Sequence, residues 1–320
     1  MATAARVVVA RQLPDAGLEL LRSKFEVDVG GARLDRQTLL RRLPGAAALV
    51  ADPTVPVDAE LLDCAGPSLR VVANFAVGYD NVDLAACRVR GVVVTNTPNV
   101  LTDATAELTV ALMLAAARHL GEGERLVRAG SWEGWEPQQL LGLELRTATV
   151  GVVGPGRIGA RVAELVSGFG SRLLYASRKS RPELESRLGI ERRALEELVG
   201  EADVVTLHVP LDADTRHMVD RRLLGRFKPG ALLVNTARGG LVDTDALVEA
   251  LQSGRLGGAG LDVYENEPDV PAELVALENV VLAPHLGSAT HTARDGMARL
   301  AAENVIAVLE DREPPTPITN

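Results

Sequence analysis

Short valine-rich runs alternate with helical stretches along nearly the whole chain, and this alternation limits the fold more than any other feature. The runs are almost continuously apolar, which is typical of strands buried on both faces, as in a parallel sheet covered by helices. They occupy residues 6–10, 47–50, 70–76 and 92–96, and then 148–154, 172–177, 203–210, 231–238, 259–263 and 280–285. We therefore predict an α/β protein with two doubly wound parallel sheets.

Composition excludes several classes of protein. With 320 residues, 47% of them hydrophobic, the chain can fill two cores. Its net charge of -9 disfavours nucleic acid and anionic membrane surfaces as partners. No run approaches the ~20 apolar residues of a membrane span, and the first twenty residues lack the pattern of a secretory signal. Cys64 and Cys87 have neither CxxC spacing nor partner histidines. We expect a cytoplasmic protein without a metal site.

The residues between the two series of strands predict a connection between two lobes. Residues 101–120 have helical periodicity, with Thr102 as a capping residue and Asp103 in the first turn. Residues 130–145 contain both tryptophans and no strong periodicity, so we expect an excursion that packs across a lobe or a subunit boundary. A last helix is expected at about 292–310, before a breaker-rich tail.

A glycine-rich turn joins the strand at 148–154 to a helix. Gly154, Gly156 and Gly159 form the pattern G-x-G-x-x-G, which becomes specific when it follows a strand and opens a helix. Gly154 permits a tight turn, Gly156 lets a pyrophosphate approach the backbone, and Gly159 lets the helix pack on the strand. Arg157 adds a cation that can reach the phosphates. We predict a dinucleotide site here.

The end of the next strand indicates which dinucleotide binds. In NAD-binding versions of this fold an acidic residue there accepts hydrogen bonds from the ribose 2'-hydroxyl. This chain has Ser177, Arg178 and Lys179 instead, which suit a 2'-phosphate. We predict NADP(H) as the preferred cofactor, with NAD(H) as the alternative if the two cations are only solvated turn residues.

Three ionisable residues lie at or just after strand ends in the second half: Arg238, Glu267 and His285. The carboxyl ends of strands line the ligand crevice of an open α/β sheet, so these side chains can converge on one substrate. An imidazolium can donate a proton to a carbonyl oxygen that receives hydride at its carbon, and a neighbouring carboxylate stabilises and orients that imidazolium. A guanidinium can bind a substrate carboxylate together with the carbonyl oxygen. We predict these roles for His285, Glu267 and Arg238 respectively.

Seven stretches in family order make the chain resemble the D-isomer-specific 2-hydroxyacid dehydrogenase family, and most closely its glyoxylate and hydroxypyruvate reductases. They are VVANFAVGYDNVD (71–83), the VTNTPNVLTDATAEL join, GVVGPGRIG, HVPL (208–211), NTARGGLVDTDAL (235–247), GAGLDVYENEP (258–268) and LAPHLGSAT (282–290). The resemblance implies a flavodoxin-like, substrate-binding catalytic domain of residues 1–98 and 286–320. It also implies a Rossmann domain of residues 99–285 that binds NAD(P), an active-site cleft between the two domains, and a homodimer.

The resemblance also implies individual residue roles. Arg238, Glu267 and His285 match the family's catalytic residues. The implied cofactor contacts are Thr105, Gly154, Pro155, Gly156, Arg157, Ile158, Ser177, Arg178, Lys179, His208, Val209, Pro210, Thr215, Thr236, Ala237, Asp262 and Gly287. The implied substrate contacts are Ala76, Val77, Gly78, Arg238, His285 and Trp135. Val77 and Gly78 would offer backbone N–H groups to the substrate carboxylate. Trp135 would reach a neighbouring subunit's site, or serve only in dimer packing.

Together these features predict an NADPH-preferring reductase of small 2-oxo acids. Related activities remain as alternatives. Formate dehydrogenases carry Gln at the position of Glu267, which disfavours that activity. Phosphite dehydrogenase has Lys at the position of Val77, and the same loop offers no extra basic residue to the phosphate of a phosphoglycerate dehydrogenase substrate. A non-catalytic, dinucleotide-sensing corepressor would share the fold and the three ionisable residues.

Overall fold

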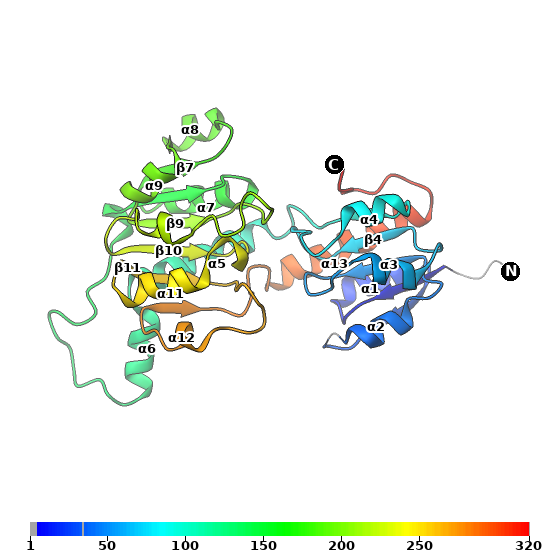
Figure 1. The fold of residues 1–320 in the computed structure, drawn as a ribbon, viewed down its shortest axis with the longest axis horizontal. Helices are drawn as coiled ribbons and strands as arrows, with labels where there is room; N and C mark the ends of the chain where they lie inside the picture. The colour runs from blue at the N-terminus through cyan, green and yellow to red at the C-terminus, as the bar shows by residue number, and fades with distance from the viewer. Residues whose placement is uncertain (1–4, 34, 320) are drawn as a thin grey trace. The chain divides into compact units, whose positions relative to one another are not determined.

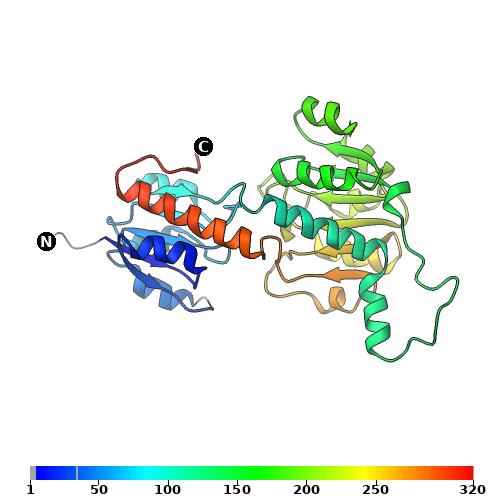
Figure 2. The ribbon, with the colours of Figure 1, turned by 180° about the vertical axis from the view of Figure 1, so that it is seen from behind.

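The computed structural model describes residues 5–33 and 35–319; the predicted domains also include residues 1–4, 34 and 320, which lie outside this range. The chain forms two compact units (Figures 1 and 2). The first unit contains the residues up to Leu101 and those from Ala289 onward, and the second consists of Thr102–Ser288. The chain therefore leaves the first unit once and returns to it.

The first unit is built on a five-stranded parallel sheet. Its strands are β1 (Arg6–Val9), β2 (Glu26–Val29), β3 (Ala48–Ala51), β4 (Val71–Asn74) and β5 (Val93–Thr95). Their spatial order is β2-β1-β3-β4-β5, so the direction of winding reverses between β1 and β3. This is the flavodoxin-like order, and it confirms a doubly wound sheet.

Helices cover both faces of this sheet. They are α1 (Asp15–Arg22), α2 (Arg36–Arg42), α3 (Ala59–Ala65), α4 (Leu84–Val89) and α13 (His291–Leu309). Aspartate side chains cap the starts of α2, α3 and α4. Those three helices lie on one face, and α1 and α13 lie side by side on the other (Figures 1 and 2). Gly17 of α1 packs so tightly that a β-carbon would lie 2.4 Å from the carbonyl oxygen of Ala298. The last helix is therefore an integral part of the first unit.

The second unit is built on a seven-stranded parallel sheet. Its strands are β6 (Thr149–Val153), β7 (Arg172–Ala176), β8 (Glu191–Arg192), β9 (Val204–Leu207), β10 (Ala231–Asn235), β11 (Leu256–Leu261) and β12 (Val280–Leu282). The order is β12-β11-β10-β9-β6-β7-β8, with the reversal between β6 and β9. This is the Rossmann arrangement extended by one strand, and the glycine-rich turn leaves β6 at the reversal point, where such sheets bind ligands.

The helices of the second unit also form two layers. They are α5 (Thr102–Ala117), α6 (Leu120–Arg128), α7 (Arg157–Ser167), α8 (Pro182–Leu188), α9 (Leu195–Glu201), α10 (Arg221–Leu224), α11 (Thr244–Gln252) and α12 (Ala272–Val275), with 3-10 turns η1 (Leu145–Thr147) and η2 (Gly239–Leu241). Helices α5 and α7 pack together on one face, and α9 and α11 lie on the other (Figures 1 and 2). Apolar cores fill both sides of the sheet.

Several predicted element boundaries differ from the structure. Three strands end three residues earlier than predicted, because a turn with polar residues follows each of them. They were predicted at 203–210, 231–238 and 280–285. Strands β2 and β8 were not predicted, since β2 has no fully buried residue and β8 has two exposed ones. The helix predicted at 101–120 is interrupted at His119, whose φ of 50° belongs to the left-handed region. In the described part of the chain no helix is both long and apolar enough to span a bilayer.

Candidate active site

The glycine-rich turn has the backbone geometry that dinucleotide binding requires. Gly154 has a φ of 84°, and a β-carbon there would lie 2.6 Å from Val209 and 2.9 Å from the backbone of His208. A β-carbon on Gly159 would lie 2.5 Å from the carbonyl oxygen of Gly154, so α7 packs directly on the turn. Around Gly156, by contrast, a β-carbon would meet nothing within 4 Å. The turn is closed on its inner side and open on the side where a pyrophosphate would approach.

The start of α7 offers hydrogen-bond donors to that open side. No side chain of the described residues caps the helix at Gly156. Arg157 is its first residue and is exposed, Ile158 is half-buried, and Pro155 is buried under the turn. The uncapped N–H groups and the positive end of the helix dipole suit an anion. These residues therefore fit the phosphates of a dinucleotide.

The segment after β9 lies beside this turn. Burial lowers the pKa of His208 to about 3, so its imidazole is neutral, and its Nε2 lies 2.9 Å from Oγ1 of Thr206. Pro210 is exposed, and its carbonyl oxygen accepts a hydrogen bond from the Thr215 hydroxyl at 2.7 Å. The structure thus brings His208 and Val209 to the glycine turn, whereas the Thr215 hydroxyl closes its own loop.

Cations surround the end of β7. Arg178 and Lys179 are exposed, and Ser177 is half-buried. Arg192 of β8 donates hydrogen bonds to the carbonyl oxygens of Ser177 at 2.9 Å and Arg178 at 3.0 Å. Arg192 therefore holds this turn in place and adds a third cation that the sequence did not single out.

A buried polar network joins the start of α5 to the segment after β12. Thr105 donates its hydroxyl hydrogen to the carbonyl oxygen of Gly287 at 3.0 Å. Thr109 donates to the carbonyl oxygen of Thr105, and its hydroxyl lies 2.7 Å from that of Thr236. The carboxylate of Asp262 accepts hydrogen bonds from the N–H of Gly287 at 2.8 Å and of Leu286 at 2.6 Å. The predicted contacts Thr105, Thr236, Asp262 and Gly287 therefore form one cluster.

Arg238 lies in a turn organised by the last residue of β10. The buried side chain of Asn235 accepts a hydrogen bond from the N–H of Ala237 at 3.0 Å and donates one to the carbonyl oxygen of Arg238 at 2.8 Å. Asn235 is a positioning residue that the sequence analysis missed, although a polar residue at the end of a buried strand is a recognisable signal. The guanidinium of Arg238 is half-buried and donates to the carbonyl oxygen of Ala237 at 2.9 Å.

Glu267 and His285 are in direct contact. Oε2 of Glu267 lies 2.7 Å from Nδ1 of His285, and Oε1 accepts a hydrogen bond from the N–H of Tyr264 at 3.0 Å. The N–H of His285 donates to the carbonyl oxygen of Asp262 at 2.9 Å, which fixes a residue whose φ of 55° is unusual for histidine. The structure therefore joins a carboxylate after β11 to an imidazole after β12.

The charges of this group favour an ionised carboxylate on Glu267. Burial alone would raise the pKa of Glu267, but the hydrogen bond and charge of His285, the N–H of Tyr264 and the charge of Arg238 hold that pKa below its ordinary value. The positive charge of Arg238 therefore also favours the ionised form of Glu267. Burial raises the pKa of Asp262, although the N–H groups of Leu286 and Gly287 act in the opposite direction.

The predicted substrate loop follows β4 in the first unit. Its three carbonyl groups accept hydrogen bonds from the surrounding protein: Ala76 from the N–H of Thr97 (2.8 Å), Val77 from Asn96 Nδ2 (2.8 Å) and Gly78 from Asn74 Nδ2 (2.9 Å). Within the described residues no hydrogen bond engages the N–H of Val77 or Gly78. The loop therefore presents two adjacent donors suited to a carboxylate.

Trp135 lies in the excursion after α6 and is 81% exposed. The segment 131–144 has no helix or strand and projects beyond the sheet of the second unit (Figures 1 and 2). Its end is anchored by the N–H of Leu143, which donates to the carbonyl oxygen of Ala117 at 2.8 Å. Across residues 5–33 and 35–319, no group of three or more His, Cys, Asp or Glu is arranged to hold a metal ion.

Comparison with known proteins agrees with this geometry. Residues 110–287 match the family profile described as "D-isomer specific 2-hydroxyacid dehydrogenase, NAD binding domain". The glyoxylate reductase of Thermococcus onnurineus is 48% identical over 317 residues, which cover 97% of this chain and 95% of the relative. The chain belongs to the D-isomer specific 2-hydroxyacid dehydrogenase family. Membership assigns the second unit to the family's NAD binding domain.

Solved structures of similar proteins extend over both units. A Thermus thermophilus protein is 49% identical, with a TM-score of 0.92, and the match covers 98% of this chain and all of that one. An NADPH-dependent glyoxylate/hydroxypyruvate reductase of Sinorhizobium meliloti, solved with NADP and malonate, is 36% identical, with a TM-score of 0.89. That match covers 99% of this chain and 97% of that one. This member of the dehydrogenase family therefore shares its whole fold with these proteins.

Proposed function

We propose that the protein reduces small 2-oxo acids, glyoxylate and hydroxypyruvate, to D-2-hydroxy acids with NADPH. The observation that carries this proposal is the 2.7 Å contact between Glu267 and His285. A carboxylate-supported imidazole and a guanidinium, each at the end of one of three neighbouring strands, are the groups that reduction of a 2-oxo acid needs. The glyoxylate reductases among the relatives support the choice of substrate.

Each residue has one role in the proposed mechanism. When bound, the reduced nicotinamide supplies the hydride. His285 donates a proton from Nε2 to the carbonyl oxygen as negative charge develops there, because Nδ1 is held by Glu267. Glu267 stabilises and orients the imidazolium. Arg238 binds the carboxylate and carbonyl oxygen of the substrate and polarises the carbonyl group.

The N–H groups of Val77 and Gly78, with Ala76 beside them, are proposed as further ligands of the substrate carboxylate. This proposal is supported by the three carbonyl groups of the loop, each of which accepts a hydrogen bond from the protein. Two N–H donors side by side form an anion-binding element of the kind found in backbone nests. The loop carries no basic side chain at Val77, which suits a small monocarboxylate better than an inorganic dianion.

NADPH is proposed as the preferred cofactor because cations surround the end of β7. Arg178 and Lys179 are exposed there, and Arg192 holds the turn. A 2'-phosphate would gain charge-assisted hydrogen bonds at this position. Asp262, Thr105, Thr236, Ala237 and Gly287 are proposed to line the nicotinamide side of the same site.

We also propose a homodimer. Large apolar side chains are exposed on α6 and on the excursion that follows it: Leu120, Val127, Trp132, Trp135 and Leu141. A surface of this kind on one projecting segment is typical of an interface. Light scattering on the purified protein gives the mass, and a monomer at micromolar concentration would contradict the dimer.

Steady-state kinetics tests the proposed function. Glyoxylate, hydroxypyruvate and a panel of bulkier 2-oxo acids are assayed with NADPH and with NADH. We expect turnover of the two small acids with a higher kcat/KM for NADPH. A protein that binds the dinucleotide but turns over no 2-oxo acid would instead be a dinucleotide sensor.

A further inference from the structure

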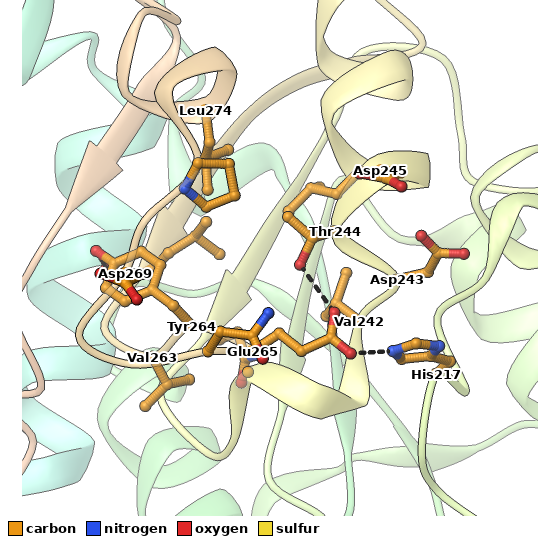
Figure 3. A pocket seen from close by; sticks show the side chains of 16 residues that line it. His217, Val242, Asp243, Thr244, Asp245, Val263, Tyr264, Glu265, Asp269 and Leu274 are labelled. Atoms are coloured by element: carbon orange, nitrogen blue, oxygen red, sulfur yellow. Dashed lines mark hydrogen bonds and ion pairs between the residues drawn. The ribbon is translucent and has the colours of Figure 1, made fainter.

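The loop that carries Glu267 also carries a second glutamate, whose side chain has a different set of partners. Glu265 belongs to the same segment after β11, but its carboxylate points into a cavity of about 400 Å³ in the second unit (Figure 3). The cavity is lined by His217, Asp243, Thr244, Tyr264 and Asp269, among others. Glu265 has no place in the proposed proton transfer, so its contacts need another explanation.

Glu265 is held by three donors. Its Oε1 lies 2.6 Å from Nε2 of His217 and accepts a hydrogen bond from Arg216 at 3.2 Å. Its Oε2 accepts one from the hydroxyl of Thr244, the first residue of α11, at 3.3 Å (Figure 3). The Glu265 side chain is only 18% exposed, compared with 32% for Glu267. The better-anchored carboxylate of the loop is therefore the one without a proposed catalytic role.

The donors of Glu265 are attached to the segment that follows Arg238. The N–H of His217 donates to the carbonyl oxygen of Gly240 at 2.9 Å, and the N–H of Val219 donates to that of Leu241 at 3.0 Å. Val219 and Val242 form a parallel bridge. Residues 217–219 therefore run beside η2, which begins directly after Arg238. Through His217, Glu265 connects its own loop to η2.

Three contacts of Tyr264, the residue before Glu265, connect this anchor to Glu267 and His285. Gly239 lies so close to the backbone of Tyr264 that a β-carbon would be 1.9 Å from the carbonyl carbon of Tyr264. The Tyr264 hydroxyl donates to the carbonyl oxygen of Ala283 at 2.9 Å, two residues before His285. The N–H of Tyr264 donates to Glu267. Tyr264 is thus fixed between Gly239, the segment before His285, and Glu267 itself.

From these contacts we infer that Glu265 is a positioning residue for the Glu267–His285 pair, anchored by His217, Arg216 and Thr244. The inference rests on the proposed function, because it assigns Glu265 to the reaction that Glu267 and His285 would perform. Without the anchor the loop gains freedom, and Glu267 spends less time within hydrogen-bond distance of Nδ1 of His285. Misplacement of catalytic groups by about 1 Å can cost about 100-fold in rate.

The cavity makes this inference testable by substitution. Because Glu265 faces an open cavity rather than the apolar core, its truncation leaves space that water can fill. Glu265→Ala removes all three hydrogen bonds, and Glu265→Gln keeps an acceptor for His217. Asn266→Ala changes the next, exposed side chain of the same loop and is the matched control.

The kinetic experiment compares these variants with the wild type and with Glu267→Ala. We expect Glu265→Ala to lower kcat about 10- to 100-fold and to leave the KM for NADPH within about twofold, as expected for loss of a supporting contact. Glu265→Gln should recover most of the loss, and Asn266→Ala should match the wild type. The double variant Glu265→Ala/Glu267→Ala should be no slower than Glu267→Ala, because both changes disable one pair. Multiplied losses would overturn the inference.

A readout independent of turnover separates this inference from the proposed function. We expect the proton between Nδ1 of His285 and Glu267 to give a downfield ¹H NMR signal in the wild type, identified by its absence in Glu267→Ala. We expect the signal to be lost in Glu265→Ala and kept in Asn266→Ala. If the signal persists in Glu265→Ala, the positioning role of Glu265 is overturned, whether or not the wild type reduces a 2-oxo acid. If the signal is lost in Glu265→Ala but the wild type turns over no 2-oxo acid, only the proposed function is overturned.

Discussion

Replacing Gly239 by alanine tests how closely the loop after β10 must approach the loop after β11 for the proposed reaction. A β-carbon at Gly239 would lie 1.9 Å from the carbonyl carbon of Tyr264 and 2.3 Å from the N atom of Glu265. Ordinary contact begins at 3.4 Å, so the backbone of the Glu267 loop must retreat by about 1.5 Å. A retreat of that size would take Glu267 from 2.7 Å to beyond hydrogen-bond distance of His285.

The expected cost of Gly239→Ala is about 100-fold in kcat, the usual consequence of a misplacement of 1 Å or more. Gly240→Ala is the matched control: it changes the adjacent residue, and the atoms nearest to its β-carbon would be the flexible side-chain ends of Leu211 at 3.2 Å and Arg216 at 3.4 Å. We expect Gly240→Ala to keep kcat within about threefold of the wild type. Circular dichroism and NADPH titration check that both variants fold. A folded Gly239→Ala variant with wild-type kcat would show that the close approach of these loops is not required.

Three further predictions concern the cofactor, the proton donor and pH. Arg178→Ala combined with Lys179→Ala should raise the KM for NADPH strongly and leave that for NADH nearly unchanged; equal losses with both cofactors would contradict a 2'-phosphate site. His285→Ala should reduce kcat by about 100- to 10,000-fold while the Kd for NADPH stays similar, and a variant that kept most of its rate would remove His285 from the proton-donor role. Because the pKa of Glu267 is below its ordinary value of 4.5, its contribution to the free energy of unfolding is complete above that pH and is lost as the pH falls through the lowered pKa. Urea titrations across this range should show a steeper acid loss for the wild type than for Glu267→Gln, and parallel curves would contradict the ionised pair.

The sequence predicted the fold class, but not two of the four edge strands. Apolar runs identify strands buried on both faces, so the central strands were found and the doubly wound parallel sheets are confirmed. The edge strands β2 and β8 carry half-buried or exposed residues and lack that signal. Strand ends were also placed too late, because Asn235 ends β10 with side-chain hydrogen bonds that periodicity does not show.

The candidate site could be predicted as residues but not as contacts. Arg238, Glu267 and His285 were predicted from strand ends and from resemblance, and the structure brings Glu267 and His285 together. The sequence ENEP does not indicate which of its two glutamates faces His285, because loop conformation decides it. The approach of Gly239 to Tyr264 joins residues 25 positions apart and has no local signal. The predicted cleft and the individual cofactor contacts stay predictions.

Transfer of a labelled hydride tests whether the protein reduces a 2-oxo acid stereospecifically with His285 as proton donor. The protein is incubated with hydroxypyruvate and NADPH deuterated at both C4 positions of the nicotinamide, and the product is analysed by mass spectrometry and chiral chromatography. We expect D-glycerate with one deuterium at C2 from the wild type, and about 100-fold less or lower still from His285→Ala at the same enzyme concentration and time. L-glycerate, unlabelled product, or equal product from the two proteins would contradict reduction with His285 as proton donor.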